Sequence, residues 1–155
     1  MRKAAAKKRY LAPDPVYKDS LVTRFANDMM LSGKKSTSFA ILYGAMDIIK
    51  ETSGEDGYET WKKACANVMP SVQVKSRRIG GATFQIPSPI REDQKISMTN
   101  KWLISFARKR NGKSMKEKLA AELLAASKGE GPSIKKKEDV HKMAEANKAF
   151  AHFRI

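Results

Sequence analysis

The chain has little cysteine and little histidine, and this excludes several kinds of site. Cys65 is its one cysteine, so no internal disulfide forms and no Cys-x-x-Cys pair is present to hold zinc. The two histidines, His141 and His152, have no second ligand at metal spacing. The composition therefore suits a reducing compartment and predicts no metal site.

Long apolar runs and nucleotide-binding loops are also missing. No segment reaches membrane-spanning length, and the apolar stretch of a secretory signal does not follow the basic N-terminus, so we expect a cytoplasmic protein with no membrane partner. Gly-Lys occurs at residues 33–34 and 112–113, but a phosphate loop needs a glycine five positions earlier, where Asp28 and Ala107 stand. No nucleophile with a histidine base is evident. We predict no enzyme and no cofactor.

Acidic residues are scarce relative to basic ones. The 155 residues contain 31 Lys and Arg against 16 Asp and Glu, a net charge of +15. The first 70 residues have a net charge of +4 and the rest +11. Such an excess attracts polyanions, so nucleic acid is the leading partner. A hydrophobic content of 41% is enough for one domain with a real core.

Apolar residues at helical spacing predict a mainly α protein, with a basic arm over residues 1–18 and one helical domain over residues 19–155. In the first helix the expected buried face is Leu21, Phe25 and Met29. The expected helices run from Asp19 or Ser20 to about Ser32, from a cap at Ser36 or Thr37 to Ser53, from about Gly57 to just before Pro70, from a cap at Asp93 to about Arg110, from a cap at Ser114 to just before Gly129, and from Ser133 onward.

Between the third and fourth helices, residues 71–88 are typical of a two-stranded antiparallel β-ribbon. Gly80 and Gly81 form its loop, because glycine tolerates the positive φ angles of a two-residue hairpin turn. Neither face of such a ribbon is cleanly apolar, which favours a projecting ribbon that docks on something anionic; a solvated surface hairpin is the alternative. The predicted pairs are Ile79 with Ala82, Arg78 with Thr83, Arg77 with Phe84, and Lys75 with Ile86.

Five separate runs of cations share one explanation, which is that they bind phosphates. On the ribbon, Phe84 and Ile86 offer apolar surface to a base or sugar. RNA suits a ribbon and an arm better than DNA does, because no clear recognition helix for a major groove is visible. A DNA-binding module and an RNA-modifying or nucleotide-hydrolysing enzyme are the rivals. The runs are the arm, Lys34-Lys35, the ribbon, Arg108-Lys109-Arg110 with Lys113, and Lys135-Lys136-Lys137.

Three stretches resemble the bacterial form of the small-subunit ribosomal protein seven family, over nearly the whole chain. One begins at Asp19-Ser20-Leu21 and continues through Gly33-Lys34-Lys35 to Ala45. The others are residues 72–87 and 136–154. The resemblance implies six helices with a protruding ribbon between the third and fourth. It also implies a primary binder of small-subunit ribosomal RNA that nucleates assembly of the subunit head, in the 3′ major domain.

The same resemblance implies a position near the decoding centre, beside the exit-site transfer RNA and the messenger RNA, with ribosomal proteins nine and eleven as partners. Two departures from relatives are an arm with fewer arginines and an acidic stretch at residues 91–95. The residues assigned to ribosomal RNA are Arg2, Lys3, Lys7, Lys8, Arg9, Lys34, Lys35, Lys75, Arg77, Arg78, Arg108, Lys109, Arg110 and Lys113. Those assigned to transfer RNA, messenger RNA or a protein partner are Ile79, Gly80, Gly81, Lys148, His152 and Arg154.

Overall fold

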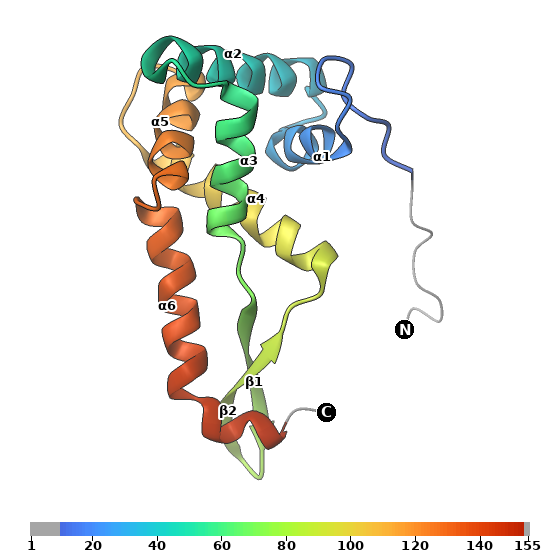
Figure 1. Cartoon of the computed structure of the whole chain (residues 1–155). Coiled ribbons are helices and arrows are strands. Elements are labelled where there is room, and N and C mark those ends of the chain that lie inside the picture. The colour runs from blue at the N-terminus through green and yellow to red at the C-terminus, as the bar shows by residue number, and fades with distance from the viewer. Residues whose placement is uncertain (1–9, 154–155) are drawn as a thin grey trace.

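Residues 10–153, which the computed structural model describes, form six α-helices, one two-stranded sheet and a short 3₁₀-helix (Figure 1). The predicted mainly α fold with a ribbon between the third and fourth helices is confirmed. The elements are α1 (Ser20–Met29), α2 (Lys35–Ser53), α3 (Gly57–Val68), β1 (Val72–Ile79), β2 (Ala82–Pro89), α4 (Glu92–Lys109), α5 (Met115–Ser127), α6 (Pro132–Ala146) and η1 (Lys148–Phe153).

At the helical end, α2, α3 and α4 all pack against α5. The core is built from side chains such as Leu42, Leu103 and Leu123, which have no exposed surface. Phe25 of α1 meets Trp61 of α3 edge-on, with ring centroids 5.9 Å apart. Each buried side chain of this size contributes about 1.5–3 kcal/mol on leaving water. This core fixes the loops that carry the candidate cations.

The ends of α1 and α2 differ from the prediction. Helix α1 ends at Met29 instead of Ser32, because the backbone turns out of the helical conformation at Met30, where ψ is 137°. Ser32 and Gly33 follow with positive φ angles of 50° and 74°. Helix α2 begins at Lys35, and neither Ser36 nor Thr37 caps it. Instead, the Ser38 hydroxyl donates to the Ala26 carbonyl at 2.5 Å and ties α2 to α1.

Of the other predicted helix caps, those at Asp19 and Ser114 are confirmed and that at Asp93 is wrong. Asp19 and Ser114 do cap α1 and α5, since each side chain accepts a backbone N–H of the first turn. The predicted cap at Asp93 is wrong: α4 begins at Glu92, and Arg91 precedes it without a side-chain bond. On α1, Leu21 was predicted to be buried but is 40% exposed. Val22 is buried in the core instead.

The ribbon has the predicted register throughout. Gly80 and Gly81 form its loop with φ angles of 57° and 89°, the left-handed values that a tight hairpin of this kind requires. The pairs include Arg77 opposite Phe84 and Lys75 opposite Ile86. Because facing residues share a face, two cations and two apolar side chains lie on the same side of the ribbon.

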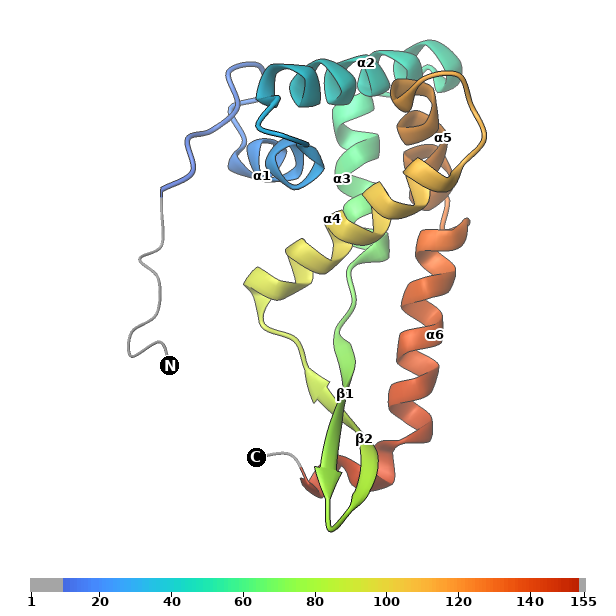
Figure 2. The same cartoon turned by 180° about the vertical axis from the view of Figure 1, so that it is seen from behind.

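The apolar half of that face is covered, which corrects the prediction that it is open to a base or sugar. Ile86 is only 2% exposed. Phe84 packs on Phe150 and Phe153 of η1, with ring centroids 5.3 and 5.8 Å apart. Figures 1 and 2 both show α6 running beside the ribbon and η1 crossing it. The sequence pattern did not predict η1 as an element separate from the sixth helix.

Candidate nucleic-acid interface

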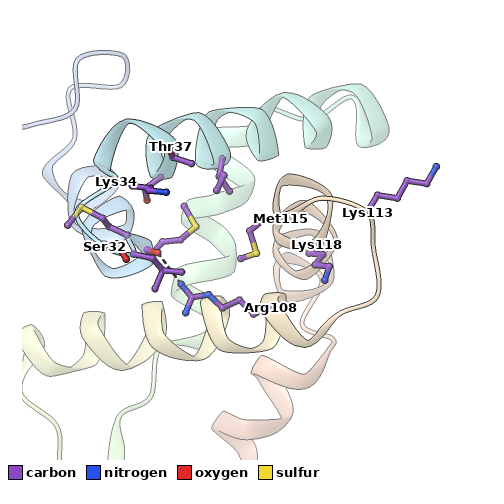
Figure 3. Close-up of a pocket in the computed structure, with 12 residues that line it drawn as sticks. Ser32, Lys34, Thr37, Arg108, Lys113, Met115 and Lys118 are labelled. Atoms are coloured by element: carbon purple, nitrogen blue, oxygen red, sulfur yellow. Dashed lines mark hydrogen bonds between the residues drawn. The ribbon is translucent and has the colours of Figure 1, made fainter.

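Two loops at the helical end bring together cations that are far apart in the sequence. The connection from α1 to α2 carries Lys34, and the connection from α4 to α5 carries Lys113, with Arg108 at the end of α4. All three line one pocket of about 660 Å³, which we name the α1–α4 pocket (Figure 3). The sequence assigned these three residues to RNA from two separate runs, and the structure places them around one pocket.

The α1–α4 pocket contains a fourth cation that the sequence analysis missed. Lys118 lines it, three residues after Met115, which Figure 3 shows pointing into it. Residues three apart share a helix face, so this spacing was the available signal. Lys113 extends away from the helices in the same view. The remaining lining is largely apolar, from residues such as Met29, Leu31 and Ile41.

Arg108 is held in place by the end of α1. Its guanidinium donates to the Met29 carbonyl at 3.0 Å, the dashed line in Figure 3. A cation at a helix C-terminus is stabilised by the negative end of the helix dipole. Arg108 is still an exposed residue. It is therefore fixed in position and accessible to an anion.

The start of α2 adds a second source of positive potential. No side chain caps this helix, and Lys34 and Lys35 are both exposed there. The Lys35 ammonium lies 5.8 Å from the centre of the Phe39 ring. Helix N-termini carry a partial positive charge and bind phosphate groups readily. This end of α2, next to the α1–α4 pocket, is thus suited to a phosphate backbone.

Arg110 has a different setting from its neighbours. Its Nε donates to the carboxylate of Glu122 at 2.5 Å, and Glu122 is fully buried. The Ser133 hydroxyl donates to the other carboxylate oxygen, also at 2.5 Å. This group joins the ends of α4 and α6 to α5. Arg110 therefore has a structural role, and its assignment to RNA stays a prediction. Lys109 is exposed, 5.6 Å from the centre of the Phe106 ring.

The second cluster of candidate cations is at the far end of the molecule. Lys75, Arg77 and Arg78 are exposed on β1, and the exposed Lys148 and His152 lie on η1. Contact between η1 and β2 brings these two sets together, although the sequence assigned them to different partners. At the tip, Gly80 and Gly81 are exposed and Ile79 is half-buried.

Residues 1–9 of the arm lie outside the described residues, as does Arg154. The candidates concerned are Arg2, Lys3, Lys7, Lys8 and Arg9. The segment that follows is described, and it is anchored by Asp14, a residue that the sequence analysis did not select.

Asp14 is only 1% exposed. Its carboxylate accepts the backbone N–H groups of Val16 and Tyr17 at 3.0 and 2.8 Å, and it accepts the Tyr43 hydroxyl. Burial and the bond to Asp14 raise the pKa of Tyr43 above its usual value. Tyr17 stacks on Tyr58 at 4.5 Å. Residues 14–17 are thus fixed to α2 and α3.

The described residues give no support to a metal site or to a membrane-spanning helix. They hold no group of three or more His, Cys, Asp or Glu side chains able to bind a metal, and none of their helices is long and apolar enough to span a membrane. Cys65 packs against the core, where burial raises the pKa of its thiol to about 12. His141 accepts the backbone N–H of Ser71 at 3.2 Å and so links α6 to the base of the ribbon.

The family described as Ribosomal protein S7p/S5e matches residues 1–148 of the chain. The chain belongs to this family. The resemblance to small-subunit ribosomal protein seven is therefore confirmed, and so is the prediction that the protein is not an enzyme.

Relatives of the S7p/S5e family match the chain along its full length. The small ribosomal subunit protein uS7 of Christiangramia forsetii is 62% identical over 158 aligned residues, and that of Flavobacterium johnsoniae is 61% identical over the same length. The uS7 protein of Cytophaga hutchinsonii is 55% identical over 155 residues. In each comparison, 100% of both chains is covered.

Proposed function

We propose that the protein is a primary binder of small-subunit ribosomal RNA in its 3′ major domain, and that this binding nucleates assembly of the subunit head. The observation that carries the proposal is the gathering of cations from separate segments at two places. Lys34, Arg108, Lys113 and Lys118 surround the α1–α4 pocket, and Lys75, Arg77 and Arg78 are displayed on the ribbon. Membership of a ribosomal protein family supports the same conclusion.

Phosphate neutralisation is the physical basis of this binding. Each Lys or Arg that contacts a phosphate releases condensed counterions, so affinity falls steeply with salt. The two clusters lie at opposite ends of the molecule (Figure 2), which suits an RNA whose folded backbone passes both. Folded RNA is recognised by its shape and by its irregular, unpaired elements. We therefore expect the two clusters to contact separate parts of one RNA domain.

The deciding experiment compares the affinity of the full chain for a transcript of the 3′ major domain with its affinity for an unrelated transcript of equal length. We expect a clear preference for the 3′ domain, and duplex DNA at equal concentration should not displace it. The double variant Lys34→Ala/Lys113→Ala should lose about tenfold or more in affinity, because two charge-assisted contacts are removed. Lys50→Ala, at the other end of α2, is the matched control. Equal affinity for both transcripts would refute the proposal.

We further propose that the ribbon tip and η1 border the exit-site transfer RNA and the messenger RNA, and that this end contacts ribosomal proteins nine and eleven. The exposed positions of Gly80, Lys148 and His152 support this. A photocrosslinker attached at Ala82→Cys should react with transfer or messenger RNA in assembled subunits, and one at Lys148→Cys with protein eleven. Cys65 is packed against the core and should stay unlabelled. Absence of both crosslinks would contradict this assignment.

A further inference from the structure

The ribbon needs support beyond its own hydrogen bonds, because a two-stranded sheet alone is marginal in water. Its base is well held. Ile86 and Ile90 are buried, and the Ile90 N–H donates to the Ser71 carbonyl at 3.2 Å. His141 of α6 accepts the Ser71 N–H as well. Toward the tip, residues 75–78 of β1 are exposed.

In that half of the ribbon, Phe84 makes contact with η1. Its ring lies 5.3 Å from that of Phe150 and 5.8 Å from that of Phe153. Aromatic pairs at such distances are stabilising beyond the area that they bury. Phe84 lies on β2, opposite Arg77 of β1. Its side chain therefore joins β2 to η1.

We propose that η1 is a brace that holds the ribbon in its RNA-binding orientation, with Phe84, Phe150 and Phe153 as positioning residues. The consequence for RNA rests on the function proposed above, whereas the brace itself does not. No residue of η1 is buried, and among the described elements η1 contacts only β2 and α6. Its rings thus serve the ribbon and not the helical core.

The end of α6 directs η1 onto the ribbon. The Asn147 N–H and its side-chain amide both donate to the Met143 carbonyl, at 3.1 and 2.7 Å. The Phe150 N–H then donates to the Asn147 carbonyl at 3.0 Å, which starts the tighter turn. Figures 1 and 2 show the chain bending at this point and crossing the ribbon.

Both sides of this contact carry cations. Residues 71–90 contain three cations and no acidic side chain, and η1 contains Lys148 and no acidic side chain. A polyanion lying across both segments would attract cations of each, so binding of RNA should tighten the brace.

Amide hydrogen exchange of the full chain tests the brace without RNA. In Phe150→Ala/Phe153→Ala, we expect exchange in β1 and β2 to accelerate about tenfold or more, because the ribbon then opens locally. Exchange in α2, α3 and α5 should not change. Phe150→Tyr/Phe153→Tyr should restore slow exchange, and Phe106→Ala, a half-buried phenylalanine on α4, is the control. Unchanged ribbon exchange in the double alanine variant would overturn the brace.

Binding to the 3′ major domain transcript tests the positioning role. The double alanine variant should bind about five- to tenfold more weakly, and its loss should be less than additive with that of Arg78→Ala, because both act through the ribbon. Added transcript should slow ribbon exchange in the parent protein. Fast exchange combined with unchanged affinity would overturn the positioning role, whereas failure of the parent protein to prefer this transcript would instead refute the proposed function.

Discussion

Three consecutive cations at the end of α4 show how far surroundings decide what a residue does. Arg108 donates to the Met29 carbonyl while staying exposed, and Lys109 lies beside an aromatic ring. Arg110 is paired with the buried carboxylate of Glu122. The sequence presents the three as one basic run, but only the first two are exposed to a partner.

Arg110→Ala should destabilise the protein strongly. The substitution leaves the Glu122 carboxylate buried without its counter-charge, which typically costs about 3–5 kcal/mol. Urea unfolding followed by circular dichroism measures this loss. Lys109→Ala is the neighbouring control and should change the unfolding free energy by less than about 0.5 kcal/mol. A similar small change for Arg110→Ala would show that the pair is unimportant for stability.

Arg78→Ala should weaken RNA binding and lower the magnitude of the salt slope by about one unit, as loss of one phosphate contact does. Arg77→Ala should do the same on the opposite face of the ribbon. Titrations of the 3′ major domain transcript at several salt concentrations give the slope. Arg91→Ala, an exposed arginine outside both clusters, should leave it unchanged. An unaltered salt slope in the ribbon variants would mean that these side chains do not contact the phosphate backbone of the RNA.

At the scale of elements, local sequence sets the register of the ribbon, whereas contacts between helices decide where α2 begins. The Gly80-Gly81 turn and the two-residue repeat of a strand are enough to set every pair, so the register was predictable. The start of α2 was not predictable. Neither Ser36 nor Thr37 caps this helix, and the Ser38 hydroxyl donates to α1 instead. Such a bond depends on how two helices pack, and no local pattern contains it.

The candidate site was predictable in type and only partly in arrangement. Exposed cations follow from composition and loops, so Lys34, Arg108 and Lys113 were found. Their grouping around one pocket, and the covering of Phe84 by η1, depend on packing between distant segments. Asp14 was missed for the same reason, since its partner Tyr43 lies on α2.

Tyr43→Phe tests how residues 14–17 are anchored. The change removes the hydroxyl that donates to Asp14, and the net cost should be about 1–2 kcal/mol of unfolding free energy. Tyr10→Phe, at an 89% exposed position, is the control and should have no effect. The raised pKa of Tyr43 also predicts a pH effect. Its hydroxyl stays protonated in the folded state above pH about 10, where an unfolded tyrosine ionises.

Stability of the parent protein should therefore fall as the pH rises past about 10, and the fall should be smaller in Tyr43→Phe. Urea titrations at a series of pH values measure the difference. Identical curves for the two proteins would show that the bond to Asp14 does not control this titration.

At the scale of the whole molecule, charge works against the fold and in favour of its partner. A net charge of +15 on 155 residues repels itself in the compact state. Only three ion pairs join side chains among the described residues, and just one of them, between Arg110 and Glu122, is substantially buried. A polyanion that neutralises both clusters relieves this repulsion, so the ribosomal setting should stabilise the folded chain.

Salt should consequently have opposite effects on folding and on RNA binding. Raising sodium chloride from about 0.05 to about 0.5 M shortens the screening length and weakens repulsion, so the unfolding free energy should rise. The same change should weaken RNA binding, because counterion release is then less favourable. Urea is uncharged and suits the folding measurement. Lys135→Gln/Lys136→Gln, at exposed positions on α6, should make stability less sensitive to salt. Stability that instead falls with salt would mean that attractive ion pairs outweigh the excess positive charge.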